Sequence, residues 1–239
     1  MAETVELVRG AISAAQPFVH ASLNAAKVLA ARRSPELRVA LERCALVTAD
    51  GQGVVWAARL LGHPVPERVT GIDLMEELLA RAAHDGWSVF VLGARQEVLD
   101  MALARIRDRF PGIRVVGSHH GYFSAAQEAE VVGRIVAVRP ELLFVALETP
   151  AKELFLERHI DRLSPVFAMG VGGAVDVFAG RKKRAPGWLQ RSGLEWFYRF
   201  LQDPRRLAGR YIVGNARFMA LLARELAAQR LGRRTGTAR

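Results

Sequence analysis

The chain has 239 residues, of which 51% are hydrophobic and 24% are charged, and its formal net charge is +10. This composition excludes a largely disordered protein, and the single cysteine, Cys44, excludes an intramolecular disulfide. No run of about 18 uncharged apolar residues occurs, so the sequence predicts no transmembrane helix. Glu3 and Glu6 stand where a signal peptide would be basic, which favours a cytoplasmic protein.

Short apolar runs alternate with helical patterns through the first 170 residues. The apolar runs predict strands at 18–21, 45–48, 88–92, 114–117, 142–146 and 166–169. Apolar spacing predicts helices near 24–33, 53–61, 72–85, 95–109, 125–138 and 151–163. Strands separated by helices of this length are typical of βαβ units, so residues 1–180 are expected to form a Rossmann-like α/β core. Its mostly parallel sheet should carry helices on both faces.

The chain after residue 180 differs from this core in charge. Residues 181–239 hold 15 Lys and Arg against 3 Asp and Glu, a net of +12, so the first 180 residues sum to −2. Ser192 with Glu195 resembles a capping box, and Asp203-Pro204 predicts the start of another helix. On a helical wheel a basic stripe flanks an aromatic and aliphatic stripe, which is typical of an interfacial helix. The basic stripe is Arg206, Arg210, Arg217 and Arg224, and the apolar stripe is Leu207, Tyr211, Phe218 and Leu222.

Such a basic appendage predicts an anionic partner, and two classes remain open from the residues alone. A membrane surface fits the interfacial pattern. A nucleic acid would fit the charge and the aromatic side chains equally well, so an α/β nucleic-acid-binding protein is the alternative.

In a parallel sheet, ligands bind beyond the carboxyl ends of the strands, which directs attention to the loops there. Asp50 follows a buried strand within TADGQGV, where a carboxylate could accept a proton from a substrate hydroxyl. The alternative is that Asp50 is a turn residue or a helix N-cap. Ser22 and Asn24 follow the first strand and could bind a sugar, unless Ser22 merely caps the next helix.

Three further loops carry candidate binding residues. The turn GVGGA includes Gly172 and Gly173, whose backbone could approach a nucleotide, and Asp176 could accept hydrogen bonds from it or cap a turn. Tyr122 could stack on a base or cover the sheet edge. Lys152 could neutralise a phosphate or be a solvated charge at a helix start.

Metal-binding motifs are missing from the sequence. His119 and His120 are adjacent and therefore point in different directions, and no HExxH, DxD or Cys/His cluster occurs. The sequence therefore favours chemistry without a metal or another cofactor, in which cationic side chains and helix dipoles stabilise phosphate charge.

Taken in order, these loops resemble the bacterial WecG/TagA/CpsF glycosyltransferase family from about residue 17 to about residue 215. Eight segments carry the resemblance: SLN at 22–24, ADGQGVVWAARLLG at 49–62, ERVTGIDLM at 67–75, HGYF at 120–123, PAKE at 150–153, GVGGAVDVFAG at 170–180, RAPGW at 184–188 and GLEWFYRFLQDPRRL at 193–207.

The resemblance implies an inverting glycosyltransferase that uses a nucleotide-diphospho-sugar. The implied donors are UDP-linked N-acetylmannosamine, glucose or glucuronate. The implied acceptor is a sugar on a polyprenyl diphosphate at the inner face of the cytoplasmic membrane, in cell-surface polysaccharide synthesis. The resemblance also implies that residues 181–239 form a membrane-binding C-terminal appendage. It implies no nucleic-acid partner, and it allows self-association.

By the same resemblance, Asp50 matches the proposed general base, and Ser22 and Asn24 match polar residues of the site. Tyr122 and Asp176 match positions near the nucleotide. Arg199 and Arg206, with Arg210 beside them, match appendage arginines expected to meet diphosphate. Two positions depart from the family pattern. Lys152 replaces a glutamine by the sugar pocket, which puts the donor sugar in question, and Gly209 replaces an arginine.

Overall fold

The computed structural model describes residues 1–163, 167–191, 195–202, 209 and 213–236. The described strands are β1 Phe18–Leu23, β2 Leu46–Ala49, β3 Ser88–Gly93, β4 Arg114–His119, β5 Leu142–Ala146 and β6 Phe167–Gly170. The described helices are α1 Ala2–Ser13, α2 Ala25–Ala31, α3 Pro35–Glu42, α4 Gln52–Leu60, α5 Gly71–Asp85, α6 Gln96–Arg109, α7 Ala125–Val138, α8 Ala151–Leu163, α9 Ala174–Phe178, α10 Gly187–Arg191, α11 Glu195–Gln202 and α13 Gly214–Gly236.

These strands form a parallel sheet of six strands within the described chain, in the order β2-β1-β6-β5-β3-β4. The α/β class with a parallel sheet and a C-terminal helix is therefore confirmed. Strands β3 and β5 are adjacent, with Val89 opposite Leu142 and Gly93 opposite Ala146. Their residues are almost wholly buried, as expected of strands that are covered on both faces.

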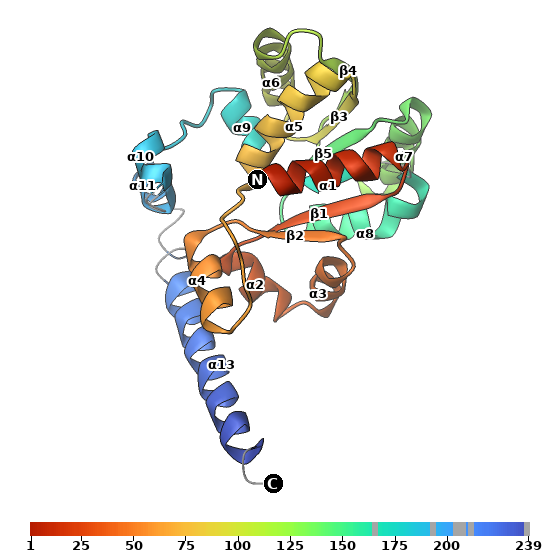
Figure 1. The fold of residues 1–239 in the computed structure, drawn as a ribbon. Helices are drawn as coiled ribbons and strands as arrows, with labels where there is room; N and C mark the ends of the chain where they lie inside the picture. Colours follow the sequence, from red (N-terminus) through yellow and green to blue (C-terminus); the bar gives the residue numbers. More distant parts are fainter. Residues whose placement is uncertain (164–166, 192–194, 203–208, 210–212, 237–239) are drawn as a thin grey trace. The chain divides into compact units, whose positions relative to one another are not determined.

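Alternate residues of each central strand point into two separate cores. Val89, Val91 and Phe144 pack with α1, α5, α6 and α9 on one face of the sheet. Phe90 and Val145 pack with α7 and α8 on the other face. The period of two residues in a strand thus gives a three-layer arrangement, with helices on both sides of the sheet (Figure 1).

The contacts divide the chain into two compact units. Unit 1 comprises residues 1–22, 36–48 and 69–183, and it contains most of the sheet with its covering helices. Unit 2 comprises residues 23–35, 49–68 and 184–239. The functional division predicted at residue 181 stays a prediction.

Unit 2 has a small core of its own, formed where α2, α4 and α13 pack together (Figure 1, orange and blue). Val54 and Val55 of α4 meet Phe218 and Leu222 of α13 in this core. The prediction that Phe218 and Leu222 belong to an exposed interfacial stripe is therefore wrong. Both side chains are buried because the apolar face of α13 covers α2 and α4.

Candidate active site

Asp50 stands between β2 and α4, at the carboxyl end of the strand. Its backbone N–H donates a hydrogen bond to the Leu23 carbonyl at 2.8 Å, so the ends of β1 and β2 are joined there. The N-cap of α4 is Gly51, whose φ of +142° suits glycine, and the alternative that Asp50 caps the helix is wrong. Asp50 thus occupies a half-buried position one residue before the cap.

Asn24 adjoins Asp50 within unit 2. A Cβ atom at Gly51 would lie 4.0 Å from the Asn24 Cβ, which places the two loops side by side. Asn24 Oδ1 accepts a hydrogen bond from the Lys27 backbone N–H at 3.0 Å and so caps α2. The alternative that Ser22 caps this helix is therefore wrong, since the capping residue is Asn24. The Asn24 amide nitrogen remains as the donor that could meet a substrate.

Ser22 lies within β1 and is buried. Ser22 is therefore a residue of the sheet, and it lies two residues before Asn24, which is in the loop between β1 and α2. The structure brings Asn24 and Asp50 together at the ends of adjacent strands, and Ser22 precedes them in the chain.

Two buried polar residues near β1 and β2 were not predicted from the sequence. Lys27 is buried in the first turn of α2, directly after the Asn24 cap. His20 is buried in β1, and its Nε2 atom lies 2.9 Å from the Thr48 hydroxyl oxygen in β2. A lysine within the apolar run AAKVLAA was the signal that could have identified the first of these.

Lys152 is buried near the carboxyl ends of β5 and β6. Its ammonium lies 3.1 Å from Glu153 Oε1 and also donates to the Thr149 hydroxyl. The side chains of Lys152 and Glu153 are only 8% and 5% exposed, so the alternative of a solvated charge at the helix start is wrong. Gly170 gives the lysine stem its space, because a Cβ atom there would lie 2.9 Å from Lys152 Cδ.

The glycine turn after β6 leads directly into α9. Gly172 has a φ of +51°, and Gly173 is the N-cap of α9. Asp176 lies in the first turn of that helix, and its Oδ2 atom accepts from Lys182 Nζ at 3.2 Å. The half-exposed carboxylate of Asp176 is accordingly held by a neighbouring lysine.

Tyr122 lies in the loop that follows β4. Its side chain is 67% exposed, so the alternative that it covers the sheet edge is wrong. The Arg95 guanidinium carbon lies 5.3 Å from the centre of the Tyr122 ring, a cation–π contact between the loops after β3 and β4. This pair presents a flat, cationic surface that could stack on a base.

Residues 1–232 match the family described as "Glycosyl transferase WecG/TagA/CpsF family". The chain belongs to this family of glycosyltransferases.

Two curated relatives carry the same name, N-acetylglucosaminyldiphosphoundecaprenol N-acetyl-beta-D-mannosaminyltransferase. The relative from Bacillus spizizenii is 36% identical over 176 residues, which cover 74% of this chain and 68% of the relative. The relative from Staphylococcus aureus is 38% identical over 167 residues, which cover 70% of this chain and 65% of the relative. The matched segment thus spans about two thirds of each relative. The predicted family and glycosyltransferase class are confirmed.

The appendage arginines of this glycosyltransferase lie outside the side chains that the structure describes. Arg199 falls in α11, but its side chain lies outside the described part of the structure. Arg206 and Arg210 also lie outside the described residues. Their predicted contact with diphosphate stays a prediction.

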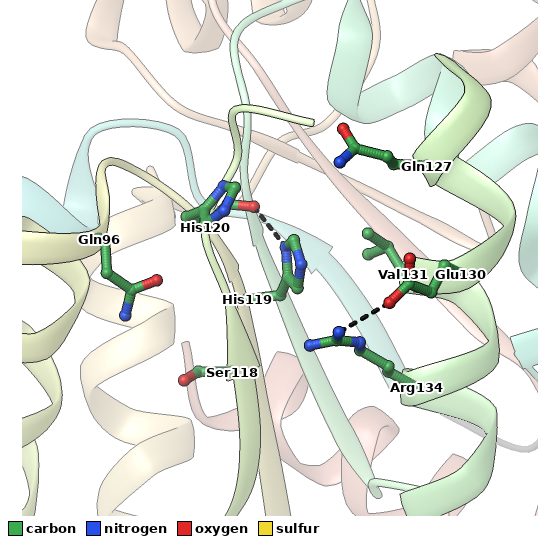
Figure 2. Close-up of a pocket in the computed structure, with 8 residues that line it drawn as sticks. All are labelled: Gln96, Ser118, His119, His120, Gln127, Glu130, Val131 and Arg134. Carbon is green, nitrogen blue, oxygen red and sulfur yellow. Dashed lines mark hydrogen bonds and ion pairs between the residues drawn. The ribbon is translucent and has the colours of Figure 1, made fainter. Parts of the chain in front are cut away.

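A separate cavity of about 340 Å³ lies in unit 1 between β4 and the helices α6 and α7 (Figure 2). It is lined by Gln96, Ser118, His119, His120, Gln127, Glu130, Val131 and Arg134. Much of its polar lining is already engaged. His119 Nδ1 lies 2.8 Å from the His120 carbonyl oxygen, and Arg134 pairs with Glu130 (Figure 2). We place the candidate active site at the ends of β1 and β2, where Asn24 and Asp50 lie, and neither of these residues lines the cavity.

No group of three or more metal-ligating side chains gathers among the residues that the structure describes.

Proposed function

We propose that the protein transfers N-acetylmannosamine from its UDP derivative to N-acetylglucosamine on undecaprenyl diphosphate. One observation carries this proposal: both curated relatives, aligned over at least 70% of the chain, are named for that same transfer. The product would enter the synthesis of a cell-surface polymer.

In the proposed mechanism Asp50 acts as general base. The acceptor hydroxyl attacks the anomeric carbon from the face opposite UDP, the bond to the diphosphate breaks, and Asp50 takes the hydroxyl proton. Attack from that face inverts the anomeric configuration. The position of Asp50 at the carboxyl end of β2, beside the Asn24 cap, supports this role because ligands bind at such strand ends.

The remaining matched residues have binding roles in this proposal. Ser22 and Asn24 bind sugar hydroxyls, and Tyr122 with Asp176 binds the nucleoside. Gly172 and Gly173 let the backbone approach the ligand. Arg199, Arg206 and Arg210 offset diphosphate charge, so that the reaction needs no metal.

The environment of Lys152 supports a neutral donor sugar over glucuronate. Its positive charge is compensated by Glu153 at 3.1 Å, and both side chains are buried. A donor carboxylate would therefore meet a pair without net charge and would gain no net attraction from it. N-Acetylmannosamine and glucose carry no such charge.

We further propose that the protein works at the inner face of the cytoplasmic membrane, because the acceptor is a lipid. None of the helices in the described chain is long and apolar enough to cross a bilayer. Attachment would therefore be peripheral, through the basic residues. Self-association stays a prediction that light scattering on the purified protein would test.

A donor panel tests the proposed function. Purified protein is incubated with a short-chain prenyl-diphosphate-linked N-acetylglucosamine and UDP-N-acetylmannosamine, UDP-N-acetylglucosamine, UDP-glucose or UDP-glucuronate, with and without EDTA. We expect UDP release only with UDP-N-acetylmannosamine, and we expect EDTA to leave the rate of release unchanged. Preference for UDP-glucuronate would contradict the donor assignment, and loss of activity with EDTA would contradict metal-free chemistry.

A further inference from the structure

Helix α4 presents two large apolar side chains to solvent. Trp56 and Leu60 are 59% and 61% exposed, and their spacing of four residues places them on one face. The opposite face of the helix is buried through Val54, Val55 and Ala57. The core of unit 2 therefore covers one apolar face of α4, and the face with Trp56 and Leu60 stays exposed to solvent.

The exposed face belongs to a helix that is held firmly within unit 2. A Cβ atom at Gly53 would lie 3.9 Å from the Phe218 ring, and Gln229 Nε2 donates to the Leu61 carbonyl at 3.3 Å. Helix α13 thus contacts α4 near its first turn and at the residue that follows its end. Arg59 fixes the following loop, since its guanidinium donates to the carbonyls of Val65 and Pro66 at 2.7–3.0 Å.

The charge of unit 2 identifies the kind of surface that would cover this face. Within unit 2, segment 184–239 contributes a formal charge of +9, segment 23–35 contributes +3 and segment 49–68 is neutral. Unit 2 therefore has a net charge of +12 and unit 1 has a net charge of −2, which together give the +10 of the chain. Arg33, Arg217 and Arg224 of unit 2 are exposed. A strongly cationic unit with an exposed tryptophan and leucine is suited to an anionic lipid surface, where tryptophan prefers the interface and leucine enters the acyl region.

We propose that the exposed face of α4, formed by Trp56 and Leu60, docks on an anionic lipid bilayer. This inference rests on the proposed function, and it adds to the appendage a second membrane contact from α4, in the first quarter of the chain. Gln52, two residues after Asp50, lies about 6 Å along the helix axis from Trp56. Docking through α4 therefore holds Asp50 close to the headgroup layer, where the diphosphate and first sugar of a lipid-linked acceptor lie.

Vesicle flotation of the full chain tests the contact. Trp56→Ser/Leu60→Ser is compared with wild type on vesicles of phosphatidylcholine with 30% phosphatidylglycerol. We expect the double substitution to lower the partition coefficient at least about tenfold. The matched control, Leu7→Ser/Val39→Ser, removes two similarly exposed apolar side chains from helices of unit 1 and should leave partition unchanged. Thermal unfolding monitored by circular dichroism establishes that each variant is folded.

Tryptophan fluorescence provides a second readout that does not depend on the double variant. In a protein carrying Trp188→Phe and Trp196→Phe, the remaining indoles are Trp56 and the buried Trp87. Anionic vesicles should shift the emission to the blue, and brominated lipids should quench it. Both responses should vanish when Trp56→Phe is added.

Three outcomes would overturn the inference. Unchanged flotation together with unquenched Trp56 would remove α4 from the contact. Equal partition onto pure phosphatidylcholine would remove the anionic lipid as the partner. The wild type could also form a dimer that Trp56→Ser/Leu60→Ser dissociates, while vesicle binding stays unchanged. That result would assign the exposed face of α4 to a contact with a second copy of the chain. None of these assays contains a sugar nucleotide, so a failed donor panel would contradict the proposed function and leave this result standing.

Discussion

The two compact units of this glycosyltransferase have net charges of opposite sign. Unit 1 has a formal charge of −2 and buries an ion pair, Lys152 with Glu153, beside the ends of its central strands. Unit 2 has a formal charge of +12 and leaves arginines and large apolar side chains exposed. Buried charges need a partner at fixed geometry, whereas exposed charges act together through a long-range field.

The comparison suggests a division of work. In the proposed function, unit 1 recognises the sugar nucleotide beside its charge-compensated Lys152–Glu153 pair. Unit 2 contains Asp50 and Asn24 with the cationic surface, which suits chemistry on an acceptor held in a membrane. Each of the following predictions tests one side of this division.

The largest expected effect is on catalysis and comes from unit 2. Asp50→Asn keeps the side-chain size but removes the base, so turnover should fall about 10²–10⁴-fold. UDP release from the preferred donor measures the loss. Asp108→Asn, at an exposed position of α6, should keep full activity. An Asp50→Asn variant with wild-type turnover would remove Asp50 from the mechanism.

The next effect is on the stability of unit 1. Lys152→Met leaves the Glu153 carboxylate buried without its ammonium partner, which should cost about 3–5 kcal/mol in the free energy of unfolding. The matched control is Lys182→Met, which breaks the solvent-exposed pair with Asp176 and should cost less than about 1 kcal/mol. Denaturant unfolding compares the two. Equal losses would mean that burial of the Lys152 pair has no energetic consequence.

Two glycines allow a similar comparison between the units. Gly93→Ala in unit 1 combines a φ of +128° with a Cβ only 2.5 Å from the Ala146 backbone, and should cost roughly 3 kcal/mol or more. Gly51→Ala in unit 2 has a φ of +142° but a nearest neighbour at 4.0 Å, so only backbone strain of about 1–2 kcal/mol is expected. Calorimetry should record the larger change for Gly93→Ala, and the reverse order would contradict the packing at β3 and β5.

The smallest effect concerns acid stability of unit 1. Partial burial of Glu128 opposes its ionisation, but hydrogen bonds and charges from His159 and Arg158 outweigh burial and lower the pKa of the carboxyl below its ordinary 4.5. A lowered pKa in the folded state means that the stabilisation is present above pH 4.5 and is lost as the pH falls through the folded value.

Unfolding temperatures of the wild type and Glu128→Gln, measured from pH 7 to pH 3, test this dependence. The difference between the two proteins should be greatest at neutral pH and should shrink on acidification. A difference that grows on acidification would show that the sign is wrong.

Much of the fold could be predicted from local patterns. The strand 142–146 and the helices 125–138 and 151–163 were predicted with the bounds that the structure has. A continuous apolar run bounded by polar residues identifies a buried strand, and amphipathic spacing identifies a surface helix. The helices α1 and α3 were missed, although the buried residues Val5, Val8 and Ala11 show helical spacing in α1.

The candidate site was predicted only in part. Asp50 and Asn24 follow different strands, and their expected proximity depends on a parallel sheet in which β1 and β2 are neighbours. The partner of Lys152 could not be predicted, because consecutive helical residues do not normally face each other. In the tertiary structure the side chains of Lys152 and Glu153 are both buried and form an ion pair.

By itself, the sequence determined the α/β class, the family and the strongly basic character of residues 181–239, since these depend on composition, local periodicity and ordered motifs. Only the tertiary structure decided which apolar faces are covered. Phe218 and Leu222 had the pattern of an exposed stripe and are buried, whereas Trp56 and Leu60 are exposed on a helix whose other face is in the core. Local spacing identifies an apolar face, but whether that face is covered depends on segments far away in the chain.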